Sequence, residues 1–141
     1  MKLIECVPNF SEGKDLNRIS LITRSIESVS GITLLDVDPG ADTNRTVITF
    51  VGEPQQVIDA AFLLIQKSQE LIDMSKHSGE HPRMGATDVC PFVPISNVTM
   101  KECIDCSCEL AEMVGNNLGI PVFLYEYSGI IFFLFSGISQ G

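Results

Sequence analysis

The sequence predicts an α/β protein of the α+β kind, a ferredoxin-like βαββαβ sandwich with an added helix and strand, in which helices cover one face of a mixed sheet. Short runs rich in branched apolar residues alternate with longer stretches whose apolar residues recur every three to four positions. Their order along the chain is β-α-β-β-α-β-α-β. The chain has 141 residues, of which 45% are hydrophobic and 19% charged, so it can bury a substantial core.

The first two elements are a strand and a helix. Residues 3–7 (LIECV) are rich in branched apolar side chains and end before Pro8, which favours a strand. Asp15 can cap the helix that follows, and Gly31 closes it. The apolar residues that share one face of this helix are Ile19, Ile22, Ile26 and Val29.

A hairpin is predicted next. Residues 32–38 (ITLLDVD) and 45–52 (RTVITFVG) have strand composition, and residues 38–44 (DPGADTN) have the composition of a turn. Asp36 and Asp38 are two positions apart, so they point to the same face of the strand. One of them could orient a histidine or stabilise a cation; the alternative is that Asp38 caps the turn.

The loop after the first strand should meet the hairpin. A right-handed crossover places the carboxyl ends of the first two strands at one edge of the sheet. Residues 8–13 (PNFSEG) and 36–44 (DVDPGADTN) are therefore expected to face one another.

The second helix and the fourth strand follow. Pro54 suits the first position of this helix, which is expected to run to about residues 74–75. Residues 86–95 (ATDVCPFVPI) have strand composition but contain Pro91 and Pro94. Because proline cannot donate a ladder hydrogen bond, these two prolines predict an edge strand or a bulge.

The third helix opens with a capping box. Thr99 and Glu102 have the T-x-x-E spacing, and the helix is expected to end at Gly119. Residues 122–128 (VFLYEYS) form the last predicted strand.

Charge excludes one class of partner. Eighteen acidic residues against nine basic ones leave a net charge of −9, and no basic stripe is present to bind a nucleic-acid backbone. Any anionic substrate must therefore be held by local lysines and arginines against the overall field.

The five cysteines indicate a reduced interior. Their odd number and the length of the chain argue against a disulfide framework and favour a cytoplasmic protein. Cys103, Cys106 and Cys108 could be read as a metal or redox cluster, but helical spacing puts the first two on the buried face and Cys108 well round the other side. We interpret Cys103 and Cys106, with Cys6 and Cys90, as core residues.

Neither end of the chain has a long apolar segment. The apolar run at the N-terminus is too short for a signal peptide, and the apolar residues after position 128 are fewer than the roughly 20 that a membrane span needs. No membrane span is expected.

Residues 76–86 (KHSGEHPRMGA) hold both histidines of the chain. They contain H-x-x-E-H, the signature of inverted zinc peptidases, but Gly79 and Pro82 disfavour the helix that such a site requires. We therefore predict no metal site. His81 is instead a candidate proton carrier at neutral pH, and the alternative is a surface histidine in a polar loop.

Four stretches together resemble one family. ECVPNFSEG, LLDVDPGADTNRTVITFVG, LIDMSKHSGEHPRMGATDVCPFVPI and MKECIDCSCELA are similar to the N-terminal subdomain of the formiminotransferases, folate enzymes of histidine catabolism. The likeness covers about Leu3 to Tyr125. We take residues 1–127 as one subdomain and residues 128–141 as a divergent apolar tail.

The resemblance implies a reaction and a set of residues. Members of the family transfer a formimino group from N-formimino-glutamate to N5 of tetrahydrofolate, which acts as a co-substrate. The catalytic histidine falls on His81, and its acidic partner is matched to Asp38. The residues that fall on stretches lining the folate and substrate pocket are Asn9, Arg45, Arg83 and Gly85.

The resemblance also raises the question of completeness. The family's enzymes have a second subdomain that closes the folate groove. One hypothesis is an enzyme that completes its site as a homodimer or by pairing with a full-length formiminotransferase. The other is a catalytically inactive module that binds folate or such a partner.

Overall fold

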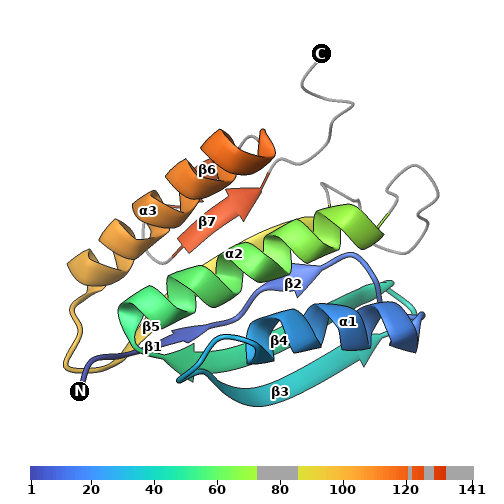
Figure 1. The fold of residues 1–141 in the computed structure, drawn as a ribbon, viewed down its shortest axis with the longest axis horizontal. Coiled ribbons are helices and arrows are strands. Elements are labelled where there is room, and N and C mark those ends of the chain that lie inside the picture. Colours follow the sequence, from blue (N-terminus) through green and yellow to red (C-terminus); the bar gives the residue numbers. More distant parts are fainter. Residues whose placement is uncertain (73–85, 121, 126–128, 133–141) are drawn as a thin grey trace.

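The computed structural model describes residues 1–72, 86–120, 122–125 and 129–132. Within these residues one sheet is covered by three helices that lie on the same face (Figure 1). The elements are β1 (Leu3–Cys6), β2 (Asn9–Phe10), α1 (Leu16–Glu27), β3 (Thr33–Gly40), β4 (Arg45–Gly52), α2 (Pro54–Leu71), β5 (Thr87–Ser96), α3 (Met100–Leu118), β6 (Val122–Tyr125) and β7 (Gly129–Phe132).

The predicted fold class is confirmed, with one difference in the sheet. The strands lie in the order β3, β4, then β1 and β2 together, β5, β7 and β6. The first six predicted elements thus have the ferredoxin-like arrangement. Every pairing between the described strands is antiparallel, whereas a mixed sheet was expected. The reason is that β4 lies between β1 and β3, so these two strands are not neighbours.

The β3–β4 hairpin is confirmed, but its turn is shorter than predicted. Pro39 and Gly40 still belong to β3 and pair with β4, and the turn is made by residues 41–44. Among the described strands β3 pairs with β4 alone, so Pro39 lies on an edge strand, where proline is tolerated. Asn44 closes the turn with a positive φ of 54°.

Prolines interrupt the central strands. The first strand was expected as residues 3–7 and is found as β1. After Pro8, where a loop was expected, the chain pairs with the sheet again as β2. The chain stays in the sheet, because the carbonyl of Pro8 accepts from the Ile48 N–H at 3.0 Å. β5 is an interior strand, not an edge, and the alternative expectation of a bulge holds at Pro94, beside a shift in its register with β1.

Most ends of the helices follow the predicted signals, but α1 ends at Glu27, before the predicted Gly31. Asp15 accepts hydrogen bonds from two backbone N–H groups of α1, and Thr99 and Glu102 form the predicted capping box of α3. Gly119 ends α3 in the left-handed conformation, with φ 67°. The second helix ends at Leu71, a few residues earlier than expected.

The core lies between the sheet and the helices. Alternate side chains of β4, such as Ile48 and Phe50, are fully buried there. Four cysteines are buried and Cys108 is exposed, as predicted. The Sγ atoms of Cys6 and Cys90 lie 3.4 Å apart across neighbouring strands.

Two features concern the last part of the chain and the membrane. The sequence did not predict β7, which lies between β5 and β6 in the sheet.

In the part of the chain that the structure describes, each helix is too short or too polar to cross a membrane.

Candidate functional site

The face of the sheet opposite the helices carries the candidate site. Because side chains alternate along a strand, the buried Thr46 and Ile48 point toward the helices and the half-buried Arg45 and Val47 point the other way. Val47 is paired with Asp38 on one side. On its other side it is paired with Asn9 of β2.

This register sets the spacing of the polar groups. Residues directly opposite one another share a face, so Asp38 and Asn9 flank Val47 on adjacent strands. With about 4.8 Å between strands, the two polar residues stand roughly 10 Å apart. Arg45 is two pairs nearer the turn, opposite Gly40, so its side chain shares the face of Val47.

A cavity of about 200 Å³ occupies this region. Three of its lining residues, Asn9, Asp38 and Arg45, were predicted as site residues from three separate stretches of the sequence. The Asn9 side-chain nitrogen donates to the carbonyl of Val7 at 3.3 Å, which orients the amide. The described residues that line it are Asn9, Asp38, Gly40, Thr43, Arg45 and Val47.

The lining combines opposite charges with an apolar floor. The Arg45 guanidinium can bind a carboxylate in a bidentate manner, and the Asp38 carboxylate can accept from a protonated nitrogen. The amide of Asn9 and the hydroxyl of Thr43 offer both donors and acceptors. Such a cavity suits a small polar molecule that carries a carboxylate and a basic nitrogen.

Other predicted site residues fall outside the described part of the chain. His81, Arg83 and Gly85 lie in residues 73–85, as does the H-x-x-E-H motif. In the ranges that are described, no three His, Cys, Asp or Glu side chains are grouped as metal ligands.

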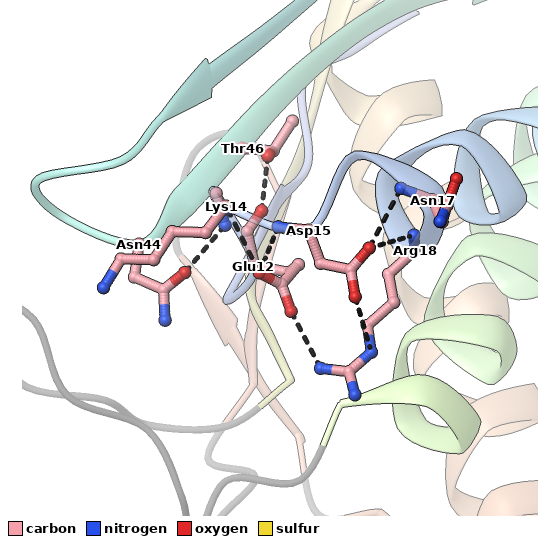
Figure 2. A network of polar contacts seen from close by, with 8 residues as sticks. Glu12, Lys14, Asp15, Asn17, Arg18, Asn44 and Thr46 are labelled. Carbon is pink, nitrogen blue, oxygen red and sulfur yellow. Dashed lines mark hydrogen bonds and ion pairs between the residues drawn. The ribbon is translucent and has the colours of Figure 1, made fainter.

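A buried glutamate holds the loop beside the cavity (Figure 2). Glu12 is 4% exposed, and its Oε2 accepts from the N–H groups of Lys14 and Asp15 at 3.1 and 3.0 Å. Its Oε1 accepts from Arg18 at 3.1 Å. Burial acts to raise the pKa of Glu12, but these backbone donors and the Arg18 guanidinium outweigh burial and keep the pKa below its ordinary value.

The sequence alone did not single out the rest of the lining. Gly40 and Thr43 were seen as parts of a turn, and Val47 as an ordinary strand residue. The signal that could have found Val47 is its place two residues after Arg45 on a strand that alternates in burial. Gly40 and Thr43 could be assigned to the cavity lining only from the structure, which shows that β3 ends at Gly40.

Comparison with known proteins gives a consistent set of similarities. The model of the formiminotransferase domain, N-terminal subdomain, matches residues 3–130. The formimidoyltransferase-cyclodeaminase of Dictyostelium discoideum is 57% identical over 125 residues, 89% of this chain and 23% of that protein. Its counterpart in Gallus gallus is 55% identical over 124 residues, 88% of this chain and 23% of that protein.

A shorter relative is also similar. The glutamate formimidoyltransferase of Streptococcus pyogenes serotype M1 is 52% identical over 127 residues, which are 90% of this chain and 42% of that protein. The chain therefore spans between about a quarter and two fifths of the length of these relatives.

Proposed function

The chain belongs to the formiminotransferase family through its N-terminal subdomain, and on that premise we propose that it carries part of a site that transfers a formimino group from N-formimino-glutamate to tetrahydrofolate. The observation that carries the proposal is the shared cavity. Asn9, Asp38 and Arg45 come from three strands and were assigned from the sequence, and they line the same space.

Charge supports the proposed substrates. Both N-formimino-glutamate and the glutamyl tail of tetrahydrofolate carry carboxylates, which a chain of net charge −9 repels at long range. Arg45 is the cationic residue of the cavity lining, so it is the group that binds a carboxylate there. Asp38 supplies the opposite charge, which suits the nitrogen-rich part of a substrate.

The reaction needs a proton carrier. A bond forms between N5 of tetrahydrofolate and the formimino carbon, and the bond from that carbon to the glutamate nitrogen breaks. One proton leaves N5 and one reaches the departing nitrogen. We assign this transfer to His81 on the sequence alone, and we assign to Asp38 the stabilisation of the charged imidazole.

The cavity is too small to hold a whole folate by itself. About 200 Å³ is less than the roughly 300–1,000 Å³ of typical ligand pockets, so this cavity would hold only part of a folate. We propose that a second wall completes the site, supplied by another copy of the chain or by a full-length relative.

Calorimetric titration with tetrahydrofolate and with N-formimino-glutamate, kept anaerobic, tests the proposal. Arg45→Gln should weaken binding roughly 10- to 100-fold, the value of a charged hydrogen bond. Arg24→Gln, an exposed arginine in the last turn of α1, is the matched control. Asp38→Asn is compared with Asp105→Asn on the exposed side of α3.

A coupled assay of formimino transfer separates binding from catalysis. His81→Ala should remove transfer while binding persists. No binding of either compound by the wild-type chain, with or without a full-length relative, would contradict the proposal. Binding without transfer in both settings would reduce it to a folate-binding role.

A further inference from the structure

The loop that follows β2 is tied to the turn of the β3–β4 hairpin. The N–H of Gly13 donates to the side-chain Oδ1 of Asn44 at 2.9 Å, and the Thr46 hydroxyl donates to the carbonyl of Glu12 (Figure 2). Both hydrogen bonds are buried. They join segments that are 31 and 34 residues apart in the sequence.

The loop is itself rigid, so it can serve as an anchor. The carboxylate of Glu12 closes it by accepting from two backbone N–H groups and from Arg18. Gly13 is packed so closely that an added Cβ would lie 2.2 Å from the carbonyl oxygen of Gly40. The loop and the turn are therefore in close backbone contact, with little room to move relative to one another.

Asn44 occupies the critical position in the turn. Its neighbours Thr43 and Arg45 both line the cavity, whereas Asn44 is 7% exposed and reaches toward the loop. Its φ of 54° is uncommon for a residue with a side chain, although asparagine adopts it more readily than most. Glycine would accept the same backbone at no steric cost, but it lacks the side-chain oxygen that accepts from Gly13.

We propose that Asn44 is a positioning residue for the cavity: by accepting from Gly13 it anchors the turn to the loop and holds Thr43 and Arg45 where they meet the ligand. The inference rests on the proposed function for the identity of the ligand. A turn that is already ordered loses less conformational entropy when a ligand binds, so the anchor raises affinity without touching the ligand.

The test compares two asparagines that have the same positive φ. Asn44→Gly keeps the turn but removes the acceptor. Asn97→Gly is the control, because Asn97 also has φ 54° but bonds to Met1 and Ser96, away from the cavity lining. Asn44→Asp retains an acceptor oxygen and should rescue the anchor.

Three readouts are measured for each variant. Hydrogen exchange of the Gly13 amide should quicken in Asn44→Gly, and the amide resonances of Thr43 and Arg45 should shift or broaden. The Kd for tetrahydrofolate should rise roughly three- to ten-fold, the cost of ordering one or two side chains. Asn97→Gly should change none of these.

The outcomes separate this inference from the proposed function. Unchanged Gly13 exchange, or unchanged Thr43 and Arg45 resonances, would overturn the positioning role whether or not the ligand binds. A perturbed turn with an unchanged Kd would overturn it as well. If the wild-type chain does not bind tetrahydrofolate, the proposed function fails, and the positioning role is then decided by the resonances of Thr43 and Arg45.

Discussion

Replacement of Gly13 by alanine should be among the most damaging small substitutions in this chain. The new methyl carbon would lie 2.2 Å from the carbonyl oxygen of Gly40. It would also lie 2.6 Å from the nitrogen and 2.8 Å from the oxygen of Arg45. All three atoms belong to the backbone of the hairpin, so no side-chain rotation can relieve the contact.

The expected cost follows from these contacts. Overpacking in a filled interior typically costs about 1–3 kcal/mol. Here the loop and the hairpin must separate, which also strains the Gly13–Asn44 and Thr46–Glu12 hydrogen bonds, each contributing about 1 kcal/mol. The free energy of unfolding should therefore fall by about 3 kcal/mol or somewhat more, out of the roughly 5–15 kcal/mol typical of a domain.

Urea unfolding followed by far-ultraviolet circular dichroism measures this loss, since the chain has no tryptophan. Gly115→Ala is the matched control. A Cβ at Gly115 would meet nothing within 4 Å, and the residue is exposed in the last turn of α3. That variant should be more stable than the wild type by roughly 0.5–1 kcal/mol, because alanine favours helix.

A free energy of unfolding for Gly13→Ala within about 1 kcal/mol of the wild-type value would show that these contacts are relieved at little cost. The prediction is contradicted equally if Gly115→Ala destabilises the chain as much as Gly13→Ala does, because the steric contacts at Gly13 would then explain nothing.

Three further predictions concern titration, thiols and caps. Because folding lowers the pKa of Glu12, its ionised carboxylate stabilises the fold above the unfolded pKa of about 4.3, and this stabilisation is lost as the pH falls through the folded pKa. The free energy of unfolding of Glu12→Gln should therefore fall less steeply in acid than that of the wild type. Parallel plots of this free energy against pH for the two proteins would contradict the prediction. At pH near 8, Ellman's reagent should modify the exposed Cys108 rapidly and the other four cysteines, which are buried, only after unfolding. Burial also raises the pKa of Cys106 to about 11 and raises the pKa of Cys6 well above its ordinary value. More than one rapidly modified thiol in the native protein would be inconsistent with the structure. Thr99→Ala should lower the free energy of unfolding by about 1 kcal/mol through loss of the capping box, and an unchanged urea midpoint would count against that cap.

Local signals in the sequence were enough to predict most elements. The caps at Asp15 and Thr99, the glycine at the end of α3 and the hairpin partners all depend on interactions within a few residues, so composition and spacing identify them. The end of β3 did not follow in this way. Residues 38–40 have turn composition, but pairing with β4 keeps them extended as far as Gly40.

Long-range pairing explains the other differences. The sequence could not show that β1 and β2 lie between β4 and β5, nor that residues 129–132 join the sheet beside β5, because both depend on contacts between distant segments. The candidate site also depends on contacts between distant segments. Asp38 and Asn9 are brought to one cavity only by their shared partner Val47, a relation that no local pattern records.

The most direct test of the central claim is to map where tetrahydrofolate binds, by titrating it into isotopically labelled protein and following the backbone amide resonances. The largest shifts should cluster at Asn9, Thr43 and Arg45, beside the sheet face opposite the helices. Shifts centred on the helices, with these three amides unmoved at saturation, would contradict the claim.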